Sequence, residues 1–293
     1  MPMKTRRLDK ILTIATAGAA LLAATSVQAR SDAEMEAEAA REFAKIKASA
    51  PLTTNRETIN YVACVANAVV KVLEPPHSNY NWEMAIVETD QVNAFVMPGG
   101  KIVVYEGILR AARNQHQLAA VIGHEIAHVT AGHTKSKLLQ GRPAQIGVAV
   151  AAVLLGGGHY GATYTAQEAL SQGAMYGLVL PYKRGQETEA DVIGLEYMAD
   201  AGFDPRESVP LWQNMGEIAG EARSEFSSTH PSGDKRIDSL VSEWTKVLPL
   251  YNQAHEEDRI PNCQVPPHLQ KPIDHSEPEA SPTEAKTKGK GKG

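Results

Sequence analysis

The sequence has no long apolar run, which argues against a chain that crosses a membrane. Its apolar run at residues 11–24 has 14 residues, and a Gly/Ala/Val-rich stretch at residues 146–158 contains fewer apolar residues than that run. A helix needs about 20 consecutive apolar residues to span a bilayer. The sequence therefore predicts no membrane-spanning helix. We interpret residues 146–158 as a core helix, with peripheral membrane contact as the alternative.

An excess of basic residues is also absent. Without residues 1–29, the chain keeps 25 basic and 33 acidic residues, a net charge of −8. An acidic surface repels the phosphate backbone, so nucleic acid is excluded as a partner. The oligomeric state is not determined by composition.

Cysteine is scarce, since Cys64 and Cys263 are the two that occur. In an oxidising compartment they can close a disulfide that ties an early helix to the segment before the C-terminal tail. The alternative is two unpaired thiols, because spacing alone does not establish proximity.

The N-terminus has the layout of a secretory signal peptide. Four basic residues within the first ten precede the apolar run, which ends near Val27-Gln28-Ala29. This pattern predicts cleavage after Ala29 and a location in the periplasm. No cysteine follows the run, which excludes a lipid anchor there, and the run is too short to favour an uncleaved membrane anchor.

Hydrophobic periodicity predicts an α+β fold that is predominantly helical. Apolar spacing and stop signals predict helices at residues 31–48, 58–73, 115–139, 185–202 and 232–247, with another opened by Asp204-Pro205. Extended runs at residues 84–88, 94–97 and 102–105 predict a small antiparallel sheet, the last two strands joined by Pro98-Gly99-Gly100. We expect a signal peptide at residues 1–29, one folded domain at 30–263 and a disordered, proline-rich tail at 264–293.

The helix at residues 115–139 contains the motif His124-Glu125-Ile126-Ala127-His128. Residues four apart share one helix face, so both imidazoles can bind one zinc ion, and Glu125 can reach a water molecule on that ion. On a continuous helix His133 lies about 180° from His124, which predicts a structural role for His133.

A catalytic zinc site requires a third protein ligand. A metzincin would have glycine at 131 and histidine at 134, where this chain has Ala131 and Thr134. The gluzincin pattern Glu-x-x-x-Asp is present as Glu187-Thr188-Glu189-Ala190-Asp191. One turn separates Glu187 from Asp191, so Glu187 can bind zinc while Asp191 orients His124 or His128, and Glu189 is expected to point elsewhere. The alternative is a solvated, acidic helix start.

These motifs make the chain resemble the HtpX and CAAX prenyl endopeptidase family of zinc peptidases, in particular its BepA-like and LoiP-like periplasmic branch. Further shared stretches start at Asn93-Ala94-Phe95, at Tyr182-Lys183-Arg184 and at Ser228-Thr229-His230-Pro231, the last followed by Arg236. The resemblance implies a gluzincin-type domain with a small sheet beside the metal-binding helix.

The resemblance also implies roles for residues that spacing does not assign. His230 would be a fourth zinc ligand in a closed resting state or a donor to the transition-state oxyanion; the alternative is a structural histidine at a helix cap. The strand at Asn93, Ala94 and Phe95 would pair with an extended substrate, or would be an ordinary hairpin strand.

Together these features predict an exported zinc metalloendopeptidase with one Zn²⁺ per chain. Zinc would polarise the scissile carbonyl and activate water, and Glu125 would move the proton to the leaving amine. The relatives imply unfolded or misassembled proteins as substrates and a role in envelope protein quality control. Two alternatives stay open: a zinc-dependent periplasmic chaperone or binding factor with latent peptidase activity, and a hydrolase of non-peptide amides.

Overall fold

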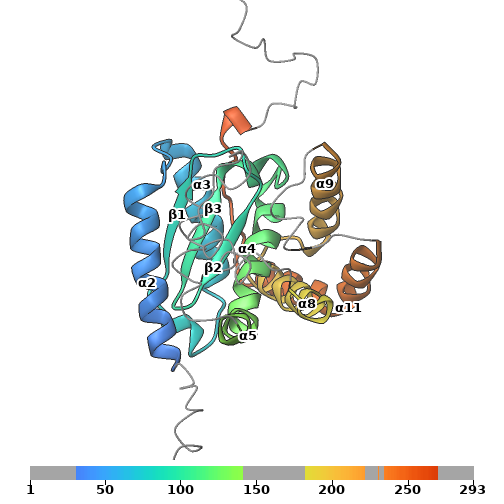
Figure 1. Cartoon of the computed structure of the whole chain (residues 1–293). Coiled ribbons are helices and arrows are strands. Elements are labelled where there is room, and N and C mark those ends of the chain that lie inside the picture. The colour runs from blue at the N-terminus through green and yellow to red at the C-terminus, as the bar shows by residue number, and fades with distance from the viewer. Residues whose placement is uncertain (1–30, 141–181, 222–229, 231–233, 270–293) are drawn as a thin grey trace, which may run out of the picture.

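The computed structural model describes residues 31–140, 182–221, 230 and 234–269 (Figure 1). Its helices and strands confirm the predominantly helical α+β class. The helices are α2 (Asp32–Ser49), α3 (Arg56–Val70), α4 (Gln115–Thr130), α5 (His133–Gln140), α8 (Arg184–Asp200), α9 (Ser208–Glu221) and α11 (Asp234–Glu256). The strands are β1 (Glu83–Val87), β2 (Ala94–Met97) and β3 (Lys101–Tyr105), and short 3-10 turns are η1 (His77–Asn79), η2 (Glu106–Arg110), η3 (Pro205–Glu207) and η4 (Pro267–Leu269).

The three strands form one small mixed sheet in the order β1-β3-β2. Strands β2 and β3 form the predicted antiparallel hairpin, and Gly99 and Gly100 turn it with φ angles of 74° and 80°. Glycine adopts such angles without steric cost. Strand β1, in contrast, pairs with β3 in parallel. Strand β3 lies between β1 and β2, and the hairpin makes β3 run opposite to β2 and therefore in the same direction as β1. The prediction of a fully antiparallel sheet is wrong for the pair of β1 and β3.

The two faces of the sheet are covered by different helices. In β3, Ile102 and Val104 join the core shared with α3 and α4, while Val103 and Tyr105 join the smaller core beneath α2. This alternation follows from the two-residue period of a strand. Helix α2 lies along one side of the sheet and α4 along the other (Figure 1).

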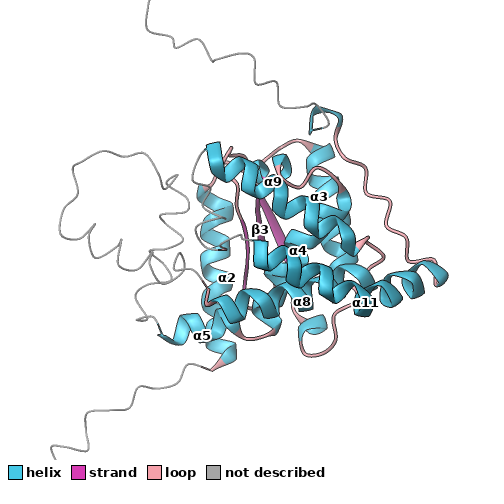
Figure 2. Cartoon of the chain, turned by 90° about the vertical axis from the view of Figure 1, so that its right-hand side faces the viewer, coloured by secondary structure: helices cyan, strands magenta, loops and turns pink. Residues whose placement is uncertain are grey.

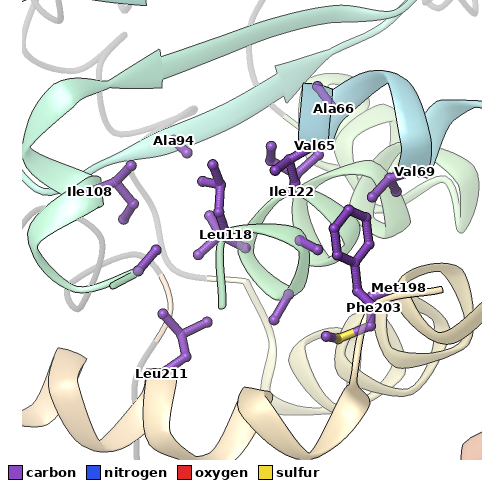
Figure 3. Close-up of a cluster of buried hydrophobic side chains, with 14 of the residues drawn as sticks. Val65, Ala66, Val69, Ala94, Ile108, Leu118, Ile122, Met198, Phe203 and Leu211 are labelled. Carbon is purple, nitrogen blue, oxygen red and sulfur yellow. The ribbon is translucent and has the colours of Figure 1, made fainter. Parts of the chain in front are cut away.

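Helix α4 is the centre of the larger core and is buried from Gln117 to Val129. Leu118 and Ile122 of this helix lie among apolar side chains from several elements (Figure 3). These neighbours are Val65, Ala66 and Val69 of α3, Ala94 of β2, Ile108 of η2, Met198 of α8, and Phe203 and Leu211. Each fully buried large apolar side chain contributes about 1.5–3 kcal/mol. The metal-motif helix is therefore held rigidly inside the protein.

Helices α4 and α8 cross at a contact between two glycines. A Cβ atom on Gly123 would lie 2.8 Å from the carbonyl oxygen of Gly194, and a Cβ atom on Gly194 would lie 2.8 Å from the backbone nitrogen of His124. Ordinary contacts of a Cβ atom are longer than this. The two backbones touch, and this places the first turn of α8 opposite the face of α4 that carries His124 and His128. Helix α8 also packs against α11 (Figure 2).

The predicted helix at residues 115–139 is two helices in the structure, and the prediction of one continuous helix is wrong. Helix α4 ends at Thr130, and Gly132 has a φ angle of 72° before α5 begins at His133. Glycine with positive φ is a common way to end a helix. The break changes the direction in which His133 points.

The structure joins Cys64 of α3 to Cys263, which follows α11, in a disulfide bond. Val265 and Leu269 pack against the larger core. The folded part of the chain therefore continues past residue 263, where the predicted domain ends.

No helix in the described ranges is both long and apolar enough to cross a membrane. The expected signal peptide at residues 1–29, the stretch at 146–158 and residues 270–293 of the tail predicted at 264–293 lie outside the described residues. Ser228, Thr229 and Pro231, which flank His230, lie outside them too.

Candidate active site

Two histidines of α4 supply the first part of the site. His124 and His128 lie four residues apart, so one face of the helix carries both rings. Asn114 caps the start of this helix by accepting hydrogen bonds from the backbone amides of His116 and Gln117. Both metal-motif histidines are buried, and their Nε2 atoms lie 3.1 Å apart.

Glu187 and His230 complete a cluster of four residues. Glu187, in the first turn of α8, places Oε1 3.3 Å from His128 Nε2 and Oε2 3.6 Å from His124 Nε2. His230 Nδ1 lies 3.2 Å from His124 Nε2 and 3.0 Å from Glu187 Oε1. The possible ligand atoms of these four buried residues all lie within 4.8 Å of one another. Three imidazole nitrogens and a carboxylate oxygen are donors that suit a zinc ion.

Glu125 lies beside this cluster with a buried oxygen that needs a partner. Its Oε1 makes no hydrogen bond to any described residue and lies 3.4 Å from His230 Nε2. Burial raises the pKa of this carboxyl above its ordinary value. A buried acceptor without a donor costs about 1–3 kcal/mol. The geometry therefore fits a further group that donates to Glu125, such as a water molecule.

Asp191 and Arg236 hold the outer side of His124. Asp191 Oδ1 lies 3.0 Å from His124 Nδ1. Arg236 donates to both carboxylate oxygens of Asp191 at 2.5 and 2.7 Å, reaches Glu187 Oε2 at 3.0 Å, and stacks over the Trp212 ring. Burial opposes the charge on Asp191, but Arg236 and His124 outweigh burial and hold the pKa of Asp191 below its ordinary value. Three histidines likewise hold the pKa of Glu187 far below normal despite burial.

The two metal-motif histidines differ in charge when no metal is bound. Burial lowers the pKa of His128 to about 2, so this ring is neutral. Burial also opposes a charge on His124, but hydrogen bonds to Asp191 and Glu187 outweigh it and raise the pKa of His124 to about 9. Metal ligands must be deprotonated. Binding of a metal ion must therefore release a proton from His124 at neutral pH.

On the side of His128 that faces away from the cluster lie residues that we did not predict to be near the site. His133 Nδ1 lies 3.1 Å from His128 Nδ1, and His133 Nε2 lies 3.1 Å from Glu189 Oε2. The prediction that His133 is remote is wrong, because the turn at Gly132 redirects it towards the site. Glu189 was expected to point elsewhere and instead contacts His133. The ring of Tyr182 stacks on His128 with 3.7 Å between centroids.

The predicted site residues on α4 and α8, together with His230, lie together as described above. The strand of Asn93, Ala94 and Phe95 packs beside α4 at an edge of the sheet, with no described strand on the outer side of β2. The sequence did not predict that His133, Glu189 and Tyr182 contact the site. The glycine at 132 is a signal that could have indicated the helix end before His133, although it does not give the direction in which His133 points.

Comparison with known proteins places most of the chain within one peptidase family. The model of the family described as Peptidase family M48 matches residues 55–244. The chain is 37% identical over 196 residues to the mitochondrial metalloendopeptidase OMA1 of Schizosaccharomyces pombe, covering 66% of this chain and 55% of that protein. It is 33% identical to human mitochondrial OMA1, covering 61% of this chain and 36% of that protein. It is 28% identical to the β-barrel assembly-enhancing protease of Yersinia pestis, covering 70% of this chain and 43% of that protein. The chain thus spans about half or less of the length of these relatives.

These relatives contradict the predicted periplasmic location. Three relatives with identities of 35% to 37% are named as mitochondrial metalloendopeptidases, whereas the two β-barrel assembly-enhancing proteases have identities of 28% and 25%. Basic residues near the N-terminus could not decide the destination, because they occur in both secretory and mitochondrial targeting segments.

Proposed function

The chain belongs to peptidase family M48, and on this premise we propose that it is a zinc metalloendopeptidase. The observation that carries the proposal is the meeting of His124, His128 and Glu187 around one point, with the buried carboxylate of Glu125 beside them. Zinc is proposed as the metal because two imidazoles and a carboxylate are a common ligand set of catalytic zinc.

In this proposal each residue has a separate task. His124, His128 and Glu187 are the metal ligands, and Asp191 orients His124 by accepting from its Nδ1–H group. Zinc in this position would polarise the scissile carbonyl and make water acidic enough to attack near neutral pH. Glu125 accepts the proton of the attacking water and delivers it to the amide nitrogen that leaves. Burial raises the pKa of Glu125 from its acidic ordinary value, which makes it a stronger proton acceptor for the first step.

His230 is proposed to control access to the fourth metal position. Its Nδ1 lies within 3.2 Å of both His124 Nε2 and Glu187 Oε1, which supports a closed resting arrangement in which His230 is a ligand. When displaced by substrate, the same ring would be close enough to donate to the oxyanion. If His230→Ala changes neither zinc affinity nor cleavage, this role is refuted.

The substrate is proposed to be an extended polypeptide that adds to the edge of β2. The outer side of β2 bears no described strand, and this strand packs beside α4. Backbone pairing with a strand edge gives affinity without demanding one sequence. Unfolded or misassembled proteins present such extended segments, which makes them the substrate class of this proposal. A role in envelope protein quality control rests on the lower-identity β-barrel assembly-enhancing proteases alone, and the mitochondrial relatives do not favour it.

The domain is proposed to extend from about residue 30 to at least residue 263. The family match at 55–244 and the disulfide to Cys263 support these limits. The alternative of a binding factor with latent peptidase activity is not favoured, because a pure binding site has no use for a buried base beside the metal.

The test is cleavage of unfolded casein by the zinc-loaded chain. Glu125→Gln is assayed at equal zinc content, and Glu196→Gln, an exposed position of α8, is the matched control. We expect the wild type and the control to cut, and Glu125→Gln to bind zinc without cutting. If Glu125→Gln cuts at the wild-type rate, the general-base assignment is wrong. If neither the wild type nor any of the variants, His230→Ala included, cleaves casein, the peptidase proposal is refuted.

A further inference from the structure

His128 has a hydrogen-bond partner on the side that faces away from the cluster. Its Nε2 atom faces His124 and Glu187, while its Nδ1 atom lies 3.1 Å from Nδ1 of His133. His133 is buried, and its other ring nitrogen lies 3.1 Å from the carboxylate of Glu189. Three residues therefore form a line that ends on a proposed metal ligand.

The chemistry of imidazole assigns the protons along this line. A histidine that binds a metal through Nε2 carries its proton on Nδ1. His128 must then donate from Nδ1 to Nδ1 of His133, which has to be unprotonated to accept. His133 in turn carries its proton on Nε2 and donates it to Glu189. Every atom in the line has a matching partner in this arrangement, and reversing the first bond would remove the lone pair of His128 from the metal.

The local structure fixes the partners in place. The turn at Gly132 brings His133 back towards α4, and the hydroxyl of Thr134 donates to the backbone carbonyl of His128 at 3.4 Å. Tyr182 stacks flat on the ring of His128, with 13° between the planes. Stacking sets the plane of the ring but does not distinguish its two nitrogens. The bond to His133 is what selects the nitrogen that faces the metal.

We propose that His133 and Glu189 are positioning residues that hold the metal ligand His128 in its binding tautomer and orientation. The inference rests on the metal site of the proposed function but does not require peptidase activity. It gives the two ligands different supports: His124 meets the buried carboxylate of Asp191 directly, whereas His128 reaches the more exposed carboxylate of Glu189 through a neutral imidazole.

The experiment measures zinc affinity by chelator competition in four variants of the full chain. His133→Leu removes the acceptor, and His133→Asn restores an acceptor oxygen near the position of Nδ1. Glu189→Ala removes the last partner, and His116→Leu is the control, because His116 is a histidine of the same helix region that bonds to the backbone of Asp204 and not to the site. Melting temperatures of the metal-free proteins report the structural cost of each change.

We expect His133→Leu to weaken zinc binding by about 10–100-fold, the range for lost partners of metal ligands. His133→Asn should recover most of this loss, and Glu189→Ala should lose less, because its side chain is 59% exposed and water can replace it. His116→Leu should lower the melting temperature without changing zinc affinity. Zinc binding of wild-type strength in His133→Leu, or no recovery in His133→Asn, would overturn the proposal.

A spectroscopic measurement separates this inference from the peptidase proposal. In the zinc-loaded chain with ¹⁵N-labelled histidine, a hydrogen bond between His128 and His133 gives a ¹⁵N–¹⁵N coupling across the bond and an exchange-protected proton on Nδ1 of His128. We expect both signals in the wild type, in an active or an inactive protein alike, and neither in His133→Leu. Absence of the coupling in the wild type would refute the positioning role, whatever the casein assay shows.

Discussion

The crossing of α4 and α8 predicts that Gly194→Ala will damage the proposed metal site from a distance. A Cβ atom at residue 194 would lie 2.8 Å from the backbone nitrogen of His124 and 3.0 Å from the carbonyl carbon of Gly123. These are backbone atoms of a buried helix, so no flexible side chain can give way. Close-packed interiors transmit such strain. Ordinary contacts of a Cβ atom begin at 3.4 Å and this one would be 2.8 Å, so α8 must move outward by about 0.6 Å.

Two opposing terms set the effect on stability. Overpacking of a core costs about 1–3 kcal/mol. The better helix propensity of alanine returns about 1 kcal/mol. We therefore expect a net loss of up to about 2 kcal/mol in the free energy of unfolding. The effect on the proposed metal site should be larger, because its proposed ligand Glu187 lies on the same rigid helix and metal–ligand distances normally stay within about 0.2 Å of their usual values. Zinc affinity should fall by about tenfold or more.

The assay pairs chemical denaturation of the metal-free chain with chelator competition for zinc. Gly216→Ala in α9 is the matched control, because a Cβ atom there meets nothing within 4 Å. It should raise the unfolding free energy by up to about 1 kcal/mol and leave zinc affinity unchanged. If Gly194→Ala is stabilised like the control and binds zinc like the wild type, the close crossing does not position Glu187 and the reasoning is wrong.

Three further predictions follow from the same structure. Reduction of the Cys64–Cys263 bond, which links residues 199 apart in sequence, should lower the unfolding free energy by up to about 5 kcal/mol, and unchanged denaturation midpoints with and without reductant would contradict it. Arg236→Met should destabilise the metal-free chain by about 3–5 kcal/mol, because it takes the guanidinium away from the buried carboxylates of Glu187 and Asp191. The exposed Arg206→Met should change the melting temperature little, and equal losses in the two variants would contradict the prediction. Zinc binding should release a proton from His124 below about pH 9, so that affinity falls with falling pH, and calorimetry in buffers of different ionisation enthalpy measures this release. If calorimetry finds no proton release at pH 7, the charge assigned to His124 is wrong. Because folding raises the pKa of His124, its contribution to the stability of the metal-free chain is complete below about pH 6.5 and is lost as the pH rises through about 9.

Local patterns in the sequence predicted the parts of the site that depend on neighbouring residues. The helical period alone places His124 and His128 on one face and separates Glu187 from Asp191 by one turn. The glycines after Met97 likewise predicted the hairpin of β2 and β3. These features need no knowledge of the rest of the fold, because they follow from backbone geometry over a few residues.

Tertiary structure decided everything that depends on which distant segments meet. The parallel pairing of β1 with β3, the approach of Arg236 to Asp191 and the meeting of the two cysteines are contacts between residues far apart in sequence. The position of His133 shows the limit most sharply. A positive φ angle at Gly132 turned a residue predicted to lie opposite the site into a neighbour of His128. Periodicity describes an unbroken helix, and one residue with another backbone conformation redirects all that follow, so the side chains that support His128 emerge only from the folded chain.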